Sequence, residues 1–160
     1  MAISDDDLER LGRCVELARK ALQAGDEPFG SVLLDGDGAI RYEDRNRVKD
    51  GDHTRHPEFA IVRWAVDNMT PDERAHATVY TSGEHCPMCA AAHAWVGLGR
   101  IVYATSSDQL VQWRTEWASP PSPVAALPIN TVAPRVVVDG PAPQFADAMK
   151  ALYEVKFGHG

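Results

Sequence analysis

The chain has 160 residues, of which 44% are hydrophobic and 24% are charged. These are the proportions of an ordinary globular protein, and a chain of this length can bury a sufficient core without disulfides. Its 23 acidic and 16 basic side chains give a net charge of −7. Because clustered Lys and Arg provide the affinity for nucleic acid, the charge argues against polyanionic partners and favours a small substrate.

The cysteine content and the absence of long apolar runs indicate where in the cell the protein is expected. The three cysteines are Cys14, Cys86 and Cys89, and an odd number with this spacing is not typical of a disulfide framework. No apolar run approaches the roughly 18 residues that span a bilayer, and the acidic start of the chain does not resemble a secretory signal. We therefore expect a reducing, cytoplasmic location and no contact with a membrane.

The first third of the chain predicts a helix and a hairpin. Hydrophobic residues recur at helical spacing over residues 4–24, and Gly25 closes this amphipathic run. Cys14 lies among its apolar positions and is expected to be a small core residue. Two β-rich stretches, 30–34 and 40–44, flank the turn sequence Asp-Gly-Asp-Gly and predict a β-hairpin.

The middle of the chain alternates helices with strands. A proline suits the first position of a helix, where its missing N–H has no partner in any case, so a helix is predicted over 57–68. A short turn follows at 70–73. Residues 78–82 and 101–105 are rich in β-branched and aromatic residues and predict strands. Between them lies an Ala-rich segment, 87–98, that is expected to be helical.

The last third begins with a proline-rich stretch. Residues 119–134 contain five prolines and predict an extended connection, either a plain linker or an arm that places the last helix on a partner subunit. A strand at 135–138 and a helix over about 142–157 follow, with Tyr153 expected in the core. Strands that alternate with helices predict an α/β layer sandwich around a mixed sheet, organised as one domain over 1–160.

Two motifs at the starts of predicted helices indicate a metal site. One is His-Pro-Glu, beginning at His56, and the other is Cys-Pro-Met-Cys, from Cys86 to Cys89. Cysteines three apart on a first helical turn direct both sulfurs to one side, at chelating distance. His56 is the natural third ligand of a Zn²⁺ ion that keeps a fourth position for water. Glu58 can take a proton from this water and return it to a ring nitrogen and a leaving amine.

The alternative is a structural zinc site that is closed by a fourth protein ligand. His53, His85 and His93 are the possible donors. A Cys-x-x-Cys pair alone does not separate the two kinds of site. The His-Pro-Glu motif thirty residues upstream favours the catalytic one, because His-x-Glu followed by Cys-x-x-Cys is the signature of zinc-dependent base deaminases.

These motifs resemble those of the cytidine-deaminase-like superfamily. Together with the segments 28–32 and 81–89 and with Asn46, they are most similar to the branch that contains bacterial guanine deaminases and tRNA adenosine deaminases. The similarity spans roughly residues 27–105. It implies a three-layer α/β/α sandwich with a five-stranded mixed sheet, usually in a dimer. It also implies that His56 joins the two cysteines as zinc ligands and that the following glutamate is the proton shuttle.

The same resemblance implies a set of substrate contacts. Asn46 matches the asparagine that holds the ring of the bound base, and Phe29 matches a residue that lines the pocket. Trp95 stands where guanine deaminases also carry a tryptophan, which favours a free purine base. Glu84 matches a glutamate that either orients the loop or contacts the substrate. Asp108, in the loop after a strand, matches the position of an acidic side chain that reads the base.

Two positions depart from the family pattern. His85 stands where a proline usually precedes the first cysteine, and Pro57 replaces an alanine whose backbone N–H can contact the substrate. A substrate carbonyl bound there loses a hydrogen bond worth about 0.5–1.5 kcal/mol. These departures bear on the identity of the substrate rather than on the chemistry.

The leading hypothesis is therefore hydrolytic deamination of a free nucleobase, with release of ammonia. Guanine is the favoured substrate, and the enzyme is expected to be a homodimer. A second hypothesis keeps the chemistry and changes the substrate to cytosine, a nucleoside or an aminated heterocycle such as an s-triazine. A third is the editing of adenosine in tRNA, which the acidic composition disfavours. A fourth is a zinc-stabilised binding module without catalysis.

Overall fold

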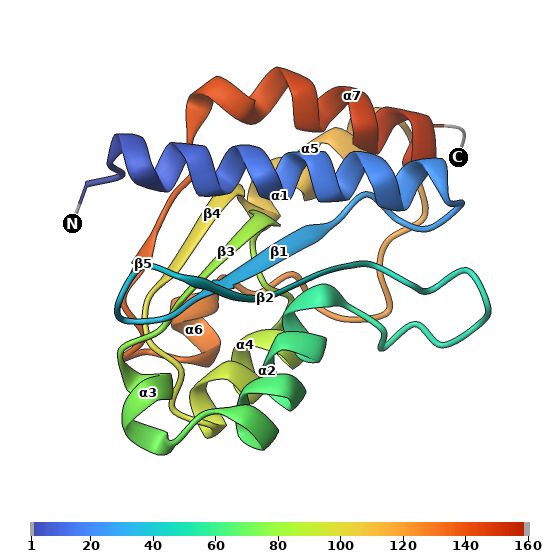
Figure 1. The fold of residues 1–160 in the computed structure, drawn as a ribbon. Helices are drawn as coiled ribbons and strands as arrows, with labels where there is room; N and C mark the ends of the chain where they lie inside the picture. Colours follow the sequence, from blue (N-terminus) through green and yellow to red (C-terminus); the bar gives the residue numbers. More distant parts are fainter. Residues whose placement is uncertain (1, 159–160) are drawn as a thin grey trace.

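A computed structural model describes residues 2–158, in which a five-stranded sheet lies between two layers of helices (Figure 1). The strands are β1 (Gly30–Leu34), β2 (Ile40–Arg45), β3 (Thr78–Gly83), β4 (Ile101–Thr105) and β5 (Val138–Asp139). Their order in the sheet is β2-β1-β3-β4-β5. β1 is antiparallel to β2 and β3, whereas β3, β4 and β5 are parallel. The predicted three-layer α/β/α sandwich with a mixed sheet is confirmed.

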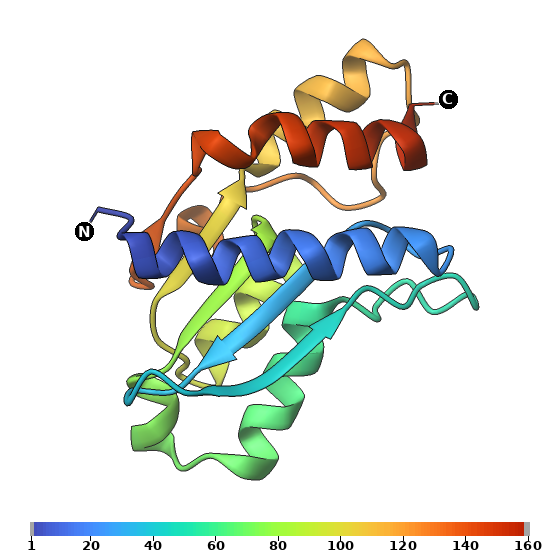
Figure 2. The same ribbon diagram turned by 45° about the horizontal axis from the view of Figure 1, so that its top comes forward.

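Each layer of helices covers one face of the sheet. One layer holds α1 (Asp5–Gln23), α5 (Ser107–Glu116) and α7 (Ala146–Phe157). The other holds α2 (Pro57–Asn68), α3 (Pro71–Ala75), α4 (Pro87–Trp95) and α6 (Ile129–Val132). Figure 2 shows α1, in blue, crossing the strands beside α7, in red. Within residues 2–158 no helix combines the length and the apolar character that crossing a bilayer requires.

The first helix forms and docks as its sequence predicts. Ser4 caps α1 through a capping box with Asp7, and the apolar side of the helix buries Leu11 and Cys14 completely. The helix lies so close to β1 that a Cβ atom at Gly30 would stand 2.5 Å from the carbonyl oxygen of Cys14. Only glycine permits this approach. The expectation that Cys14 is a core residue is confirmed.

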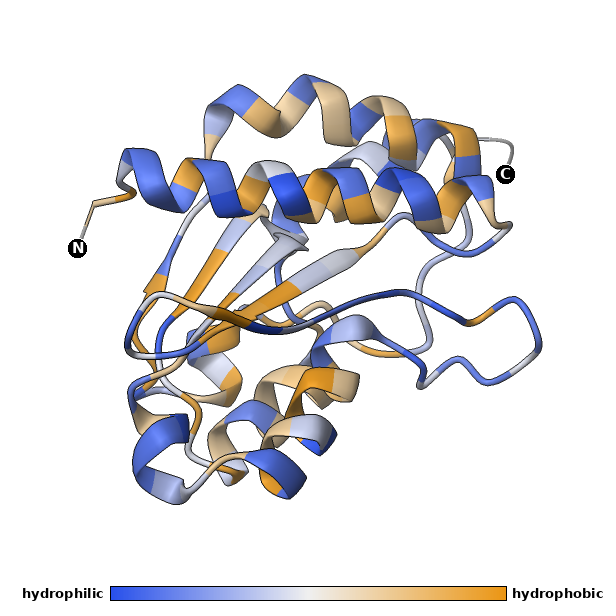
Figure 3. Cartoon of the chain, in the orientation of Figure 1, coloured by the Kyte–Doolittle hydropathy of each residue, from blue (hydrophilic) through white to orange (hydrophobic). Residues whose placement is uncertain are grey.

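Successive side chains of each strand point to opposite faces of the sheet, so the core has two layers. Val32 and Tyr80 point toward α1, whereas Leu33 and Val79 point toward α2 and pack with Ile61 and its neighbours. Hydrophobic stretches accordingly mark the strands in Figure 3, while the loop between β2 and α2 is largely hydrophilic. By the same period of two, positions 31 and 81 belong to the face that α2 covers.

Some predicted boundaries shift. α4 ends at Trp95 instead of residue 98, because Gly97 turns the chain with a φ of 72°. The last helix begins at Ala146, after a 3₁₀ turn over Pro143–Phe145. The proline-rich stretch is not wholly extended, since it contains the short helix α6.

The strand predicted at 135–138 is wrong in its bounds. Only Val138–Asp139 pair with β4, and a turn closed by a hydrogen bond from Val136 N to Ala133 O occupies the preceding residues. Hydrophobicity indicated a strand there, but this segment lies at the edge of the sheet. An edge strand has only one neighbour, so few of its residues need to pair.

The C-terminal helix packs against its own chain. Met149 and Tyr153 are fully buried in a cluster with Val15 and Ala18 of α1. This confirms that Tyr153 belongs to the core. The exchange of C-terminal segments between subunits stays a prediction, as does the dimer itself.

A buried charge network fastens α1 to the sheet. Arg100 donates through Nη1 and Nη2 to the two carboxylate oxygens of Asp7 at 3.0 Å each, and through Nε to Asp139 at 2.8 Å. Tyr80 Oη donates to the same Asp7 carboxylate at 2.7 Å. Burial raises the pKa of Asp7, but the bonds from Arg100, the Ser4 backbone and Tyr80 outweigh it and hold the pKa well below its usual range.

Asp7→Asn is expected to lower the free energy of unfolding by about 3 kcal/mol, since it leaves the half-buried guanidinium of Arg100 partly uncompensated. Urea unfolding measures this loss, and Asp6→Asn, at an exposed position of the same helix turn, is the matched control. Because the folded-state pKa of Asp7 is depressed, its contribution is present above pH ~4 and is lost at lower pH. A variant as stable as the control at pH 7 would contradict this account.

Candidate metal centre and active site

Three side chains from two helix starts meet at one point. His56 is the N-cap of α2 and Cys86 the N-cap of α4, both with extended backbone, and each is followed by a proline at the first helical position. Cys89 lies in the first turn of α4 and is fully buried. The ligand atoms of the three residues all lie within 4.8 Å of one another. The group that the sequence predicted is therefore brought together by the fold.

The geometry of this group fits a tetrahedral zinc ion. His56 Nδ1 lies 3.5 Å from Cys86 Sγ and 3.6 Å from Cys89 Sγ. With Zn–S bonds of about 2.3 Å and Zn–N bonds of about 2.0–2.1 Å, tetrahedral angles place nitrogen and sulfur about 3.6 Å apart. One imidazole and two thiols are also a donor set that zinc prefers. The residues present are thus arranged to hold this metal.

The histidines considered as a fourth ligand do not join the group. His85 and His93 are fully buried with their rings 5.5 Å apart, and Nε2 of His93 lies 2.7 Å from the carbonyl oxygen of Gly99. His53 lies exposed in the loop before α2. Among residues 2–158, the cluster of possible metal ligands here contains His56 and the two cysteines alone. This favours an open coordination position over a closed structural site.

The protonation states of the three ligands depend on one another. A hydrogen bond from the Cys89 thiol, aided by His56, lowers the pKa of Cys86 to about 4. Burial works against a charged imidazole, yet the bond to Cys86 and the nearby Glu58 carboxylate raise the pKa of His56 to about 9. The proton-donating role of Cys89 and its burial raise the pKa of that thiol. These shifts favour a Cys86 thiolate beside a protonated His56, so zinc binding must release the protons of His56 and Cys89.

Glu58 stands beside this group in a buried polar niche. It lies on the first turn of α2, is 5% exposed, and accepts hydrogen bonds at Oε1 from Ser31 Oγ and Thr81 Oγ1. Burial raises the pKa of the Glu58 carboxyl, while His56 and the two hydroxyls oppose the rise. A carboxyl whose pKa is raised holds a proton more readily than usual, so it is suited both to accept a proton and to donate one.

The two hydroxyl partners of Glu58 were not predicted as site residues. The signal was present, because serine and threonine occupy positions 31 and 81 on the core-facing side of two strands. A buried hydroxyl requires a partner. That the partner is Glu58 follows only from the packing of α2 on the sheet.

Asn46 is oriented by the backbone around it. Its Oδ1 accepts from the N–H groups of Glu27, at 3.2 Å, and Val48, at 3.1 Å. These two donors determine which end of the side-chain amide carries oxygen. The residue is 1% exposed, and its Nδ2 makes no hydrogen bond within residues 2–158. Asn46 therefore offers a fixed N–H donor with no protein acceptor.

Phe29 belongs to an aromatic group that joins the start of β1 to α7. Its ring lies 5.5 Å from that of Tyr153, which lies 6.0 Å from Trp113. The Tyr153 hydroxyl stands so close to β3 that a Cβ atom at Gly83 would be 2.7 Å from it. Phe29 is half-buried between this group and the segment that carries Asn46.

The structure shows the surroundings of Glu84, for which the sequence left two roles open, and of Asp108, which was expected in a loop. Glu84 accepts hydrogen bonds from Ser107 N at 2.9 Å and from Ile129 N at 2.8 Å, so its two oxygens fasten the starts of α5 and α6. Of its two expected roles, this contact corresponds to loop orientation. Asp108 is exposed on the first turn of α5 and not in a loop, because Ser106 and Gln109 begin the helix with a capping box. Its contact with substrate stays a prediction.

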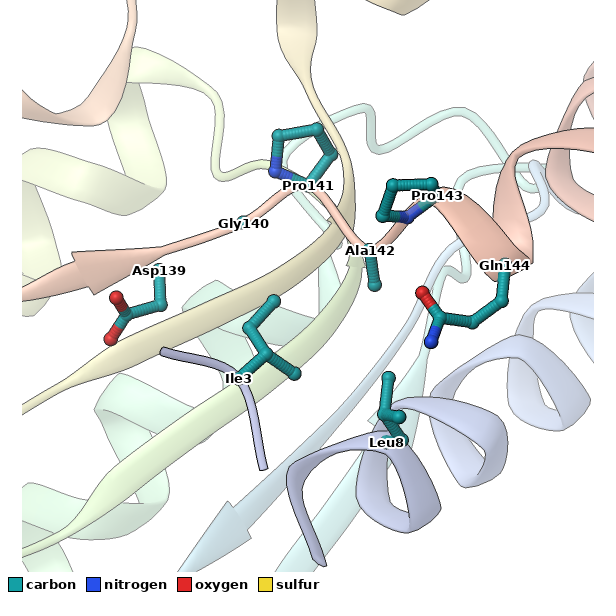
Figure 4. A pocket seen from close by; sticks show the side chains of 8 residues that line it. All are labelled: Ile3, Leu8, Asp139, Gly140, Pro141, Ala142, Pro143 and Gln144. Atoms are coloured by element: carbon teal, nitrogen blue, oxygen red, sulfur yellow. The ribbon is translucent and has the colours of Figure 1, made fainter. Parts of the chain in front are cut away.

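Trp95 does not join the metal cluster. It is 88% exposed at the end of α4 and borders a hollow of about 720 Å³ whose lining includes Leu98 and Val136. Another hollow, of about 400 Å³, opens between the start of α1 and the segment before α7 (Figure 4). None of the expected metal, catalytic or substrate residues except Trp95 lines either hollow.

The sequence from residue 4 to residue 105 matches the model of the cytidine and deoxycytidylate deaminase zinc-binding region, which is well over half of the chain. The chain belongs to this deaminase family. The matched region contains all three metal ligands as well as Asn46 and Glu58. The expectation of a zinc-binding deaminase domain is thereby confirmed.

Two named enzymes and one solved structure resemble this deaminase. A probable cytosine deaminase of Schizosaccharomyces pombe is 32% identical over 110 residues, covering 69% of this chain and 67% of that protein. The guanine deaminase of Bacillus subtilis is 38% identical over 96 residues, covering 59% of this chain and 61% of that protein. A solved guanine deaminase structure from Nitrosomonas europaea covers 97% of this chain and 86% of that chain, with a TM-score of 0.71 and 22% identity, a similarity of fold.

The two departures of this deaminase from its family have defined places. Pro57 occupies the first position of α2, where a backbone N–H would have no partner within the helix. His85 packs in the interior against His93, and burial holds its pKa well below the usual value. Neither ring nitrogen of His85 has a hydrogen-bond partner within residues 2–158.

Proposed function

We propose that the protein catalyses the zinc-dependent hydrolytic deamination of a nucleobase, with guanine as the favoured substrate. The observation that carries this proposal is a buried carboxylate, Glu58, beside a three-ligand metal group that no fourth side chain within residues 2–158 completes. When bound there, zinc supplies the Lewis acidity that activates water at neutral pH. The protein supplies the ring contacts, the exclusion of bulk solvent and the transfer of protons.

Glu58 moves the protons of the reaction. Its carboxylate takes a proton from the attacking water and gives it to the neighbouring ring nitrogen of the base, so that the amine-bearing carbon becomes tetrahedral. It then delivers the second proton to the amine, which leaves as ammonia while the oxygen of the water stays on the ring. The burial that raises the pKa of Glu58 helps it to donate a proton as well as to accept one.

Asn46 orients the ring. Because two backbone N–H groups occupy its Oδ1, the side chain can only donate, through Nδ2, to an acceptor on the substrate. The N7 and O6 atoms of guanine are such acceptors. Phe29 supplies an apolar surface at the start of the same strand pair.

The identity of the base rests on the relatives rather than on the geometry. The similarity to the Bacillus subtilis guanine deaminase favours guanine, and that to the Schizosaccharomyces pombe probable cytosine deaminase makes cytosine the second candidate. The test is ammonia release from guanine, cytosine, adenine, their nucleosides and an amino-s-triazine by the zinc-loaded protein. Turnover of cytosine with guanine inert would overturn the guanine assignment, and no turnover of any compound would overturn the enzymatic one.

Asn46→Asp separates recognition from folding. The new carboxylate keeps an acceptor for the N–H groups of Glu27 and Val48 but has no N–H to donate. We expect kcat/KM for guanine to fall roughly 30- to 100-fold, which corresponds to one unpaired buried acceptor on the substrate. The matched control is Asn68→Asp, the same chemical change at an exposed position of α2, which should leave kcat/KM unchanged. Equal kcat/KM in both variants would contradict the role of Asn46.

Trp95 supports the expected homodimer. A tryptophan that is 88% exposed beside a largely apolar hollow is unusual on a monomer, and two copies related by a two-fold axis can each place Trp95 against the hollow of the other. Trp95→Glu is therefore expected to change the mass measured by light scattering from two chains to one. Val155→Glu, at an exposed position of α7, is the control that should leave the mass unchanged. A wild-type protein that is monomeric would contradict this assembly.

A further inference from the structure

Two hydroxyl side chains occupy an otherwise apolar layer beneath α2. Ser31 in β1 and Thr81 in β3 stand opposite one another in the antiparallel register. The next pair on this face, Leu33 and Val79, packs against apolar residues of α2. Both hydroxyl residues are fully buried. A buried hydroxyl without a partner costs free energy, so each of these requires a hydrogen bond inside the layer.

Both hydroxyls converge on one atom. Ser31 Oγ lies 3.0 Å and Thr81 Oγ1 lies 2.9 Å from the same oxygen, Oε1 of Glu58. The hydroxyls are also 2.9 Å from each other, and Thr81 Oγ1 is 2.9 Å from the carbonyl oxygen of Gly83. Glu58 stands in the first turn of α2, two residues after His56, which places it next to the metal group. The two strands thus anchor Oε1, and neither hydroxyl engages Oε2.

We propose that Ser31 and Thr81 are positioning residues that hold Oε1 of Glu58 and thereby leave Oε2 as the oxygen that transfers protons at the metal. This inference rests on the proposed function, because it assumes that Glu58 carries protons. A glutamate side chain has several rotatable bonds, and an unanchored carboxylate would spend much of its time away from the reacting atoms. Two strands of a rigid sheet supply the anchor, so the reactive oxygen is held in place before substrate arrives.

The test removes each hydroxyl with little change of shape. Ser31→Ala and Thr81→Val should each lower kcat roughly 10-fold, as losses of supporting contacts in metal sites do, with KM for the base within about 2-fold of wild type. KM should hold because neither hydroxyl is expected to touch the base. Thr81→Ser keeps the hydroxyl and loses only a methyl group, so it should restore most of kcat.

A control separates positioning from general damage. Ser82→Ala removes a buried hydroxyl from the same strand, one that accepts from Gly30 N and does not contact Glu58. It should leave kcat within about 2-fold of wild type, because a residue that does not contact the reacting groups contributes little to the stability of the transition state. If Ser31→Ala and Thr81→Val kept wild-type kcat while Glu58→Gln lost it, the positioning proposal would be wrong and the proposed function would stand.

A measurement without turnover decides the proposal even if no base is deaminated. A crystal structure of the zinc-loaded Ser31→Ala, Thr81→Val double variant should show the Glu58 carboxylate in a changed or multiple conformation, with His56 and the two cysteines unmoved. A Glu58 side chain that keeps its wild-type conformation without both hydroxyls would overturn the proposal.

Discussion

Glu58→Gln is expected to lower kcat for deamination by roughly 10²- to 10⁴-fold, the usual contribution of a general acid–base residue. Glutamine has nearly the same shape and keeps an oxygen to accept from Ser31 and Thr81, but it cannot take up a proton from water. The measurement is ammonia release under saturating substrate. Zinc content and urea unfolding should stay close to wild type, because the residue is not among the metal ligands.

The matched control for this substitution is Glu9→Gln, which makes the same chemical change at an exposed position of α1. It should retain full activity. A Glu58→Gln variant with near wild-type kcat would remove the carboxylate from the reaction and with it the proposed proton transfers. Loss of zinc in this variant would instead indicate that Glu58 binds the metal.

Cys86→Ala is expected to abolish activity by releasing the metal. The wild-type chain should bind about one zinc ion, and the variant nearly none, because two protein ligands rarely retain zinc. Cys86 is the informative cysteine to replace, since its pKa of about 4 makes it the thiolate of the group before metal binds. Metal content by atomic emission and activity after added zinc are the two measurements.

Cys14→Ala provides the comparison, because Cys14 is buried in the core away from the metal group. It should bind zinc in the wild-type amount and keep its kcat, with only a modest loss of stability from the smaller side chain. Removal of zinc from the wild-type protein with a chelator should also lower its unfolding temperature, since bound metal stabilises the folded state alone. Full activity in metal-free protein would contradict a zinc-dependent reaction.

The structure gives Trp95 and Asp108 surroundings that their positions in the sequence did not indicate, while their contacts with substrate stay predictions. Trp95 follows Cys89 by six residues, which places it about 240° around the helix axis and thus on another face. The position of Asp108 after a strand suggested a loop, whereas Ser106 caps a helix that already contains this residue. In both cases the resemblance supplied an expectation from position alone, and the direction of a side chain depends on the element that carries it.

The metal group was predictable for a physical reason. His56, Cys86 and Cys89 lie at helix N-termini that proline marks in the sequence, and local geometry alone sets the two sulfurs on one side. The hydrophobic periods of helices and strands likewise predicted most elements, because burial of one face requires those periods.

The long-range contacts were decided only by tertiary structure. The pairing of Ser31 with Thr81 beneath Glu58 depends on the register of β1 and β3 and on the packing of α2, which bring together residues 23 to 50 positions apart. The same holds for Asp7 with Arg100, 93 positions apart. Local sequence determines which residues can ligate, donate or pack, but which of them meet depends on how the layers stack, and no local pattern encodes that arrangement.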